Sequence, residues 1–408
     1  MLNRRILRVK AMQSIYAFKQ AKKSHYYLAL DFIQEAFLPD LNSMEVQNKE
    51  LLEQEKQIAL AAFQQSYLSQ NIISEDALSN KVRNVIHHAI QQYYKSVEKD
   101  KQYFAKRMVV EVEAIYDRYL SILQLLVELA HMAAQDRDKK TLVKQSKRPA
   151  DYKLAENQAI ALLKNFQPLQ EGIIRKNLHW KNEEEILRSL YRELKTQETY
   201  RQYSELPKAD FEQDREIVDF ILKNLVLKKG EEKTIRTEAG EYESTEEVLL
   251  MQAYFEEHDI NWQEDRDIVK SMLSKTIKSL DPAQPLQIEL VELSLDWEAD
   301  KEFFVDLYQE SLRQEAQASA LIAQKTQNWQ TERLAFVDKI LLEMAIAEMT
   351  AFPSIPVKVS INEYIELSKK YSTPKSKLFV NGLLDAIAEE LKAQGAIKKS
   401  GRGLIDNK

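Results

Sequence analysis

Apolar residues recur at helical spacing along nearly the whole chain, and this pattern predicts an all-α protein. The opening segment, "NRRILRVKAMQSIYAFKQAKK" at residues 3–23, places Leu7, Ala11, Ile15 and Phe18 on one face of a helix, at steps of four, four and three. The low content of Gly (7) and Pro (9) supports the same conclusion. Similar spacing predicts further helices over 51–69, 80–134, 154–166, 182–203, 211–227, 245–258 and 265–280.

Polar stretches divide these helices. Residues 134–153 and 228–247 are charged and poor in apolar side chains, which predicts mobile loops. The prolines of 281–285 and 352–356 predict turns, and residues 396–408 predict a flexible tail.

One local pattern occurs three times, starting at Asp210, Asn261 and Asp296. The starts are 51 and 35 residues apart, so the period is not constant, as a solenoid repeat would require. The pattern favours three helix starts, in which Asp or Asn accepts hydrogen bonds from free backbone amides. A diverged duplication of helical hairpins is the alternative.

Length and composition limit the class of protein. At 408 residues the chain is long enough for two or three domains, and the absence of cysteine excludes disulfides, a thiol nucleophile and a thiolate metal site. No apolar run approaches the roughly 20 residues of a membrane span, so we expect no membrane contact and a cytoplasmic protein. The basic, acid-free start is also typical of an organelle transit peptide, which remains an alternative.

The chain lacks the usual motifs of catalysis. There is no phosphate-binding GxxxxGK[ST] loop, no GxGxxG after a strand, no GxSxG elbow and no HExxH among the six histidines. The adjacent His87 and His88 point about 100° apart on a helix and cannot easily share one metal ion. We therefore predict no enzyme, no cofactor and no metal.

Positive charge is concentrated at two places in a chain of net charge −6. Seven basic residues precede the first acid, Asp31, and on a helix Arg4, Arg5, Arg8 and Lys19 fall along one flank, which we expect to be exposed. The second place is 369–384, which is free of acids and interleaves aromatic residues with lysines. Cations beside exposed aromatics suit single-stranded nucleic acid, although a lysine-bearing helix end with core aromatics fits the second segment as well.

Four segments, in order, resemble the NusB family of transcription antitermination factors. They are "RRILRVKAMQSIY", "VDKILLEMAIAEM", "IPVKVSINEYIELSKKY" and "KLFVNGLLDAIA". The resemblance covers residues 1–40, which contain the basic helix and the start of the NusB-like fold, and residues 295–395, which form its C-terminal part. It implies an all-helical fold of two small bundles, in which 41–294 is an inserted helical region of unknown role and 396–408 a flexible tail.

The resemblance also implies a function. NusB-like proteins bind the boxA element of nascent ribosomal-operon RNA together with a small-subunit ribosomal protein acting as NusE, and act indirectly on the RNA polymerase elongation complex. The positions that match the family's RNA-binding residues are Arg4, Arg5, Arg8, Gln13, Tyr16, Lys377, Phe379 and Asn381. Lys375 stands where some relatives carry an acid and should strengthen RNA binding, and Asp338 and Lys339 are expected to face the partner.

Some residues depart from the family pattern or have another explanation. Ile6 replaces a frequent third arginine, and Leu378 separates Lys377 from Phe379. The segment around Phe379 and Asn381 could instead be a helix-packing corner, with Gly382 permitting close approach. With about five phosphate contacts, the logarithm of the RNA affinity should fall with the logarithm of salt concentration with a slope on the order of −3.

Two alternative functions belong to other classes of protein. The first is an RNA cytosine methyltransferase, because some of these enzymes carry a NusB-like domain. That interpretation requires a following α/β domain with a cofactor loop and catalytic cysteines. The sequence has no cysteine, and it ends soon after "FVNG". The other alternative is a helical protein–protein scaffold that has lost RNA binding.

Overall fold

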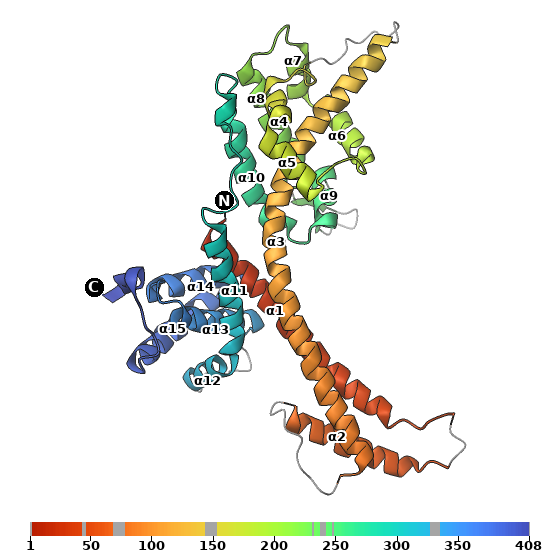
Figure 1. Cartoon of the computed structure of the whole chain (residues 1–408), viewed down its shortest axis with the longest axis vertical. Helices are drawn as coiled ribbons and strands as arrows, with labels where there is room; N and C mark the ends of the chain where they lie inside the picture. The colour runs from red at the N-terminus through yellow and green to blue at the C-terminus, as the bar shows by residue number, and fades with distance from the viewer. Residues whose placement is uncertain are drawn as a thin grey trace. The chain divides into compact units, whose positions relative to one another are not determined.

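The computed structural model describes residues 2–42, 46–67, 78–142, 153–230, 232–236, 242–246, 249–326 and 335–407. The chain divides into two compact units. The terminal unit holds Asn3–Val110 and Glu298–Lys408, and the central unit holds Met1–Leu2 and Glu111–Trp297. The described residues are predominantly helical, which confirms the predicted all-α class (Figure 1).

The terminal unit contains the two ends of the chain. Its elements are α1 (Arg4–Ala36), α2 (Lys49–Ser66), the first half of α3 (Asn80–Leu142), α11 (Trp297–Arg313), α12 (Glu315–Lys325), α13 (Phe336–Ala351), α14 (Val357–Tyr371), α15 (Ser376–Ala393) and the 3-10 helix η4 (Gly401–Asn407).

The central unit contains the second half of α3 and the helices that follow it. Its elements are α4 (Gln158–Asn165), α5 (Gln167–Lys176), α6 (Glu184–Thr196), α7 (Glu198–Glu205), α8 (Phe211–Ile221), the π-helical turn η1 (Leu222–Val226), β1 (Glu232–Arg236), β2 (Tyr242–Glu246), α9 (Leu250–His258), α10 (Trp262–Ser279) and the 3-10 turn η2 (Pro285–Gln287).

The terminal unit is built from two bundles. In the first, apolar side chains of the second half of α1, of α2 and of α3 form one buried cluster that includes Ile33, Phe63 and Ile86. In the second, α13 packs against α12, α14 and α15, and it also contacts α1. This arrangement agrees with the pair of small bundles expected from the family resemblance.

Helix α13 is the centre of the second bundle, and the stretch from Ile340 to Met349 is buried on every side. This stretch includes two acids, Glu343 and Glu348, whose side chains are withdrawn from water. A buried carboxylate must be paired or protonated, because removing an isolated charge from water costs far more than one contact returns. The partners of these acids determine the geometry of the candidate site.

In the central unit, α8 packs between α4 and α10, and α6 contacts α9. Its helix starts partly follow the predicted capping pattern. Asp210 forms a full capping box with Gln213 at the start of α8, whereas the Asn261 side chain caps nothing at the start of α10.

The structure corrects several predicted boundaries. The loop predicted at 134–153 begins later, because α3 continues to Leu142, and residues 143–152 lie outside the described residues. The loop predicted at 228–247 contains an antiparallel hairpin, in which β1 pairs with β2 from Glu232 opposite Glu246 to Arg236 opposite Tyr242. Threonine, isoleucine and tyrosine in these two segments favour strands despite the high charge.

The limits of the units differ from the predicted domain limits. Residues of α2 and the first half of α3 belong to the terminal unit, because they pack on the second half of α1. That 41–294 is a single insertion relative to compact family members stays a prediction. The predicted flexible tail instead forms η4 and is hydrogen-bonded to the turn between α13 and α14.

Candidate nucleic-acid interface

Helix α1 begins at Arg4 because the Asn3 side chain accepts a hydrogen bond from the Ile6 amide at 3.1 Å. The predicted apolar stripe is confirmed, since Leu7, Ala11 and Ile15 are all buried. Burial of this stripe fixes the rotation of α1 and therefore the directions of its basic side chains.

Arg8 is buried, contrary to the predicted exposed flank, with 3% of its surface accessible. Its Nε and Nη2 donate to the two carboxylate oxygens of Glu348, each at 2.7 Å. The Ser360 hydroxyl (2.8 Å) and the Tyr364 hydroxyl (3.0 Å) donate to the same carboxylate. The side chain therefore fastens α1 to α13 and α14 instead of projecting into solvent.

The pKa shifts around Arg8 agree with this arrangement. Burial alone would lower the pKa of Arg8, but the charge of Glu348 outweighs it and the pKa is raised above its ordinary value. Burial, with the Glu348 charge beside it, raises the pKa of Tyr364 well above 10, so the hydroxyl stays neutral and donates. The network is thus an ion pair with two neutral donors.

Lys19 is also buried, again contrary to the expected exposed flank. Its ammonium group lies 2.5 Å from a Glu343 oxygen and 2.7 Å from a Glu315 oxygen. Lys22 shares Glu315 at 3.1 Å, and the Ser319 hydroxyl donates to Glu343 at 2.9 Å. Glu343 and Glu348 of α13 are therefore paired with cations of α1.

Arg4 and Arg5 remain at the surface, with side chains 45% and 50% exposed. Arg5 forms a bidentate pair with Glu363 of α14, with both distances 2.8 Å. Arg4 lies 3.6 Å from Asp300 and places its guanidinium carbon 4.7 Å from the centre of the Phe303 ring. Exposed pairs of this kind are weak, so an incoming phosphate can compete for both guanidinium groups.

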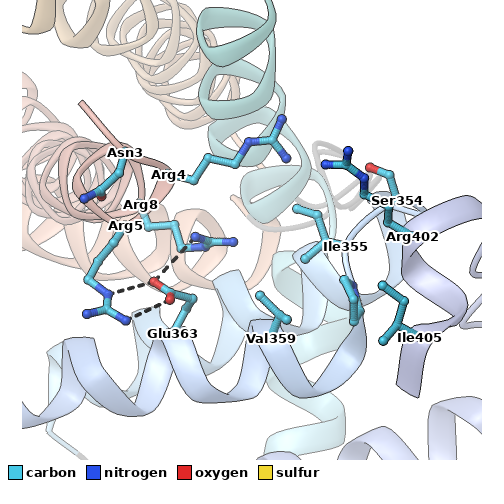
Figure 2. A pocket seen from close by; sticks show the side chains of 11 residues that line it. Asn3, Arg4, Arg5, Arg8, Ser354, Ile355, Val359, Glu363, Arg402 and Ile405 are labelled. Carbon is cyan, nitrogen blue, oxygen red and sulfur yellow. Dashed lines mark hydrogen bonds and ion pairs between the residues drawn. The ribbon is translucent and has the colours of Figure 1, made fainter. Parts of the chain in front are cut away.

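These arginines line one pocket of about 480 Å³ in the terminal unit. Figure 2 shows Arg4, Arg5 and Arg8 on one side, Arg402 on the other, and the apolar side chains of Ile355, Val359 and Ile405 among them. Glu363 is the acid in the lining, and dashed lines join it to Arg5 and Arg8. An apolar surface bordered by guanidinium groups can contact a base or sugar while the arginines bind phosphates.

Gln13 and Tyr16 lie further along α1. Gln13 is half-buried, whereas Tyr16 is 41% exposed and meets Phe336 edge to face, with ring centres 5.2 Å apart. The structure therefore leaves one face of Tyr16 at the surface on the same helix as Arg4 and Arg5.

The second basic segment, 369–384, runs from the last turn of α14 to the first half of α15. Lys375 and Lys377 are exposed, and Phe379 and Asn381 are half-buried. A Cβ at Gly382 would meet no atom within 4 Å, so close approach does not explain this glycine. The alternative of a helix-packing corner thereby loses its main physical argument.

The sequence led us to expect that Asp338 faces the partner protein. The structure contradicts this expectation. The side chain is buried, and its Oδ2 accepts a hydrogen bond from the Ser376 hydroxyl at 2.6 Å. Asp338 therefore holds the first residue of α15 against α13. Lys339 is partly exposed and lies 3.8 Å from Glu343.

Neither metal ligands nor membrane spans are found in the part of the chain that the structure describes. No cluster of three or more His, Cys, Asp or Glu side chains there could hold a metal ion. No described helix combines the length and apolar character needed to cross a bilayer.

The described chain is predominantly helical, and a pocket of its terminal unit is bordered by arginines. The model of the NusB family matches residues 263–389, from α10 into α15. A transcription antitermination protein NusB of Salinibacter ruber is 39% identical over 139 residues, which are 34% of this chain and 86% of that protein. The chain belongs to the NusB family, whose members are transcription antitermination factors and not enzymes.

Two further relatives of the same name cover shorter segments. The protein of Chloroherpeton thalassium is 54% identical over 85 residues, and that of Koribacter versatilis is 37% identical over 94. These segments are 21% and 23% of this chain, and they span only 40% and 64% of the two relatives. No solved structure matches the chain.

Proposed function

We propose that this protein binds single-stranded, boxA-type leader RNA of ribosomal operons in the cytoplasm. It does so together with a small-subunit ribosomal protein acting as NusE, and so supports processive transcription by RNA polymerase. The observation that carries the proposal is the pair of exposed arginines of α1, Arg4 and Arg5, at the border of a pocket in a chain of the NusB family.

The charge distribution supports an RNA ligand. With a net charge of −6, the molecule as a whole repels a polyanion, so RNA should be held only where cations gather. Arg4 and Arg5 supply exposed guanidinium groups, and Lys375 and Lys377 supply exposed ammonium groups at the start of α15. Such groups hold the RNA backbone, while aromatic and apolar side chains contact unpaired bases.

The buried residues of the predicted site receive different roles. Arg8 is a positioning residue, because its bidentate pair with Glu348 holds the first turns of α1 where Arg4 and Arg5 border the pocket. Asp338 positions Lys375 and Lys377 through its hydrogen bond to Ser376. Tyr16, Gln13, Phe379 and Asn381 remain candidates for base contacts, and Lys339 for contact with the ribosomal protein.

The test is a titration of labelled boxA-type RNA with the full chain, with and without the ribosomal protein. Replacing Arg5 by alanine should weaken binding and make the salt dependence shallower by about 0.7 in log–log slope. Arg313→Ala is a matched control, because Arg313 is also an exposed arginine paired with a glutamate, Glu310 at 2.6 Å, but at the far end of α11.

Absence of binding at low salt in both titrations would exclude this function and would favour a helical protein–protein scaffold. Equal losses for Arg5→Ala and Arg313→Ala would show that binding is not localised at the pocket.

A further inference from the structure

The chain after α15 turns back and is fastened to the turn between α13 and α14. The Ser400 amide donates to the Pro353 carbonyl at 3.0 Å, and the Lys399 ammonium donates to the Phe352 carbonyl at 2.9 Å. These contacts specify the path of the last residues, which the sequence alone had suggested to be a frayed end.

Two glycines on either side of Arg402 make this docking possible. A Cβ at Gly403 would lie 2.0 Å from the Pro353 carbonyl oxygen, so no other residue fits there without moving the tail. Gly401 has φ +53°, in the left-handed region that favours glycine. The segment "SGRG" at 400–403 therefore presents Arg402 in a defined place.

Arg402 is exposed and borders the same pocket as Arg4 and Arg5, from the opposite side (Figure 2). Arg4, Arg5 and Arg8 each have a carboxylate partner. Among the side chains that the structure describes, no carboxylate pairs with Arg402. Its charge can therefore act on a ligand without competition from those acids.

We propose that the tail is part of the RNA site: Arg402 binds a backbone phosphate, and the exposed apolar side chains of Val359 and Ile405 contact the adjoining base or sugar. The inference rests on the proposed function and adds to it a residue on the C-terminal side of the matched family segment, residues 263–389. The pocket volume of about 480 Å³ is in the range of sites that hold small organic groups, such as one nucleotide.

The experiment compares three variants of the full chain in the boxA-type RNA titration. Arg402→Ala should reduce affinity about fivefold at 0.1 M salt and make the salt slope shallower by about 0.7, the value for one phosphate of a single strand. Arg402→Lys should keep the slope. Lys398→Ala removes one exposed charge from the same tail outside the pocket lining and should change affinity less than twofold.

Gly403→Ala tests the docking of the tail without changing charge. It should shift the tail and reproduce the shallower slope of Arg402→Ala, while the helical circular dichroism and the melting temperature of the bundles stay close to the parent values. Equal behaviour of Gly403→Ala and the parent chain in the titration would contradict a positioned tail.

The outcomes separate this inference from the function on which it rests. If the parent chain binds RNA and Arg402→Ala behaves like Lys398→Ala, the tail is not part of the site but the RNA-binding function stands. If the parent chain does not bind RNA, both fail. If Arg402→Ala weakens only binding of the ribosomal protein in the absence of RNA, the pocket takes an acidic segment of that partner and the inference is overturned.

Discussion

At the residue scale, most of the positive charge of α1 is used to hold the fold together. Arg8 and Lys19 are buried against acids that come from helices more than 290 residues away in sequence. The stretch of α1 before Asp31 holds no acid, and α12, α13 and α14 supply the carboxylates that pair with its cations. Only Arg4 and Arg5 of the predicted basic flank remain at the surface for a ligand.

The buried pair of Arg8 and Glu348 gives a prediction for stability. Glu348→Gln removes the charge of the bidentate partner of the buried Arg8 guanidinium, and breaking such a pair costs roughly 3–5 kcal/mol of unfolding free energy. Urea unfolding of the full chain measures this loss. Glu184→Gln at the exposed pair with Arg188 is the control and should cost about 1 kcal/mol or less. Similar losses for both variants would contradict the distinction.

Glu363 also restrains the RNA site, and this gives a prediction for affinity. Its carboxylate occupies Arg5 through two hydrogen bonds and repels phosphate, so Glu363→Gln should strengthen RNA binding by up to about fivefold, the equivalent of an exposed pair of about 1 kcal/mol. The part of the gain that comes from releasing Arg5 should vanish when Arg5 is alanine, so the gain should be smaller there. Fluorescence anisotropy with labelled RNA measures the gain in affinity. The control is Glu212→Gln, which removes the acid of an exposed pair with Arg215 in the central unit and should have no effect.

The Lys19 cluster predicts a loss of stability in acid. Burial would raise the pKa of Glu315, but the charge of Lys19 outweighs it and the pKa is lowered from 4.5. The stabilisation is therefore complete above about pH 4.5 and is lost as the pH falls through the lower folded-state pKa. Thermal unfolding between pH 7 and 3 should show a smaller acid-induced decrease for Glu315→Gln than for the parent. An unchanged decrease would exclude a contribution of this carboxylate.

At the element scale, the apolar periodicity predicted most helices, because each must bury one stripe. Burial is not one-sided in every helix. Helix α13 is buried all round, and the two acids in its apolar sequence "LLEMAIAEM" indicate buried pairs without identifying their partners. Those partners could not be predicted, because Arg8 and Glu348 are 340 residues apart and meet only in the folded chain. The β1–β2 hairpin was missed because its charge outweighed its β-branched residues.

The contact between α13 and the start of α15 gives a prediction at this scale. Asp338→Ala leaves the buried Ser376 hydroxyl without this acceptor, which should cost roughly 1–3 kcal/mol of stability. Because Lys375 and Lys377 lie at this helix end, RNA binding should also weaken. Hydrogen exchange should be faster in the first turns of α15 while α2 is unchanged. Asp338→Asn keeps an oxygen acceptor for the Ser376 hydroxyl, so it should have a smaller effect than Asp338→Ala. A larger effect of Asp338→Asn would contradict the role of this hydrogen bond.

At the scale of the whole molecule, the candidate site brings together segments from both ends of the chain. The sequence and the family resemblance identified Arg4 and Arg5, but they also included Arg8, whose burial depends on the packing of α1 against α13 and α14. Arg402 was missed because a segment with few apolar residues is typical of a frayed end. Its docking depends on one glycine against one carbonyl group.

The number of exposed cations predicts the salt dependence of RNA binding by the full chain. If each of the five exposed cations Arg4, Arg5, Lys375, Lys377 and Arg402 contacts one phosphate, at about −0.7 each the slope of log affinity against log salt should be on the order of −3. The overall charge of −6 does not enter this slope, because only counterions displaced from the RNA are counted. Arg188→Glu, at an exposed pair with Glu184 in the central unit, should therefore leave the slope unchanged. A much steeper slope, or one that changes with Arg188, would show that the central unit also binds RNA.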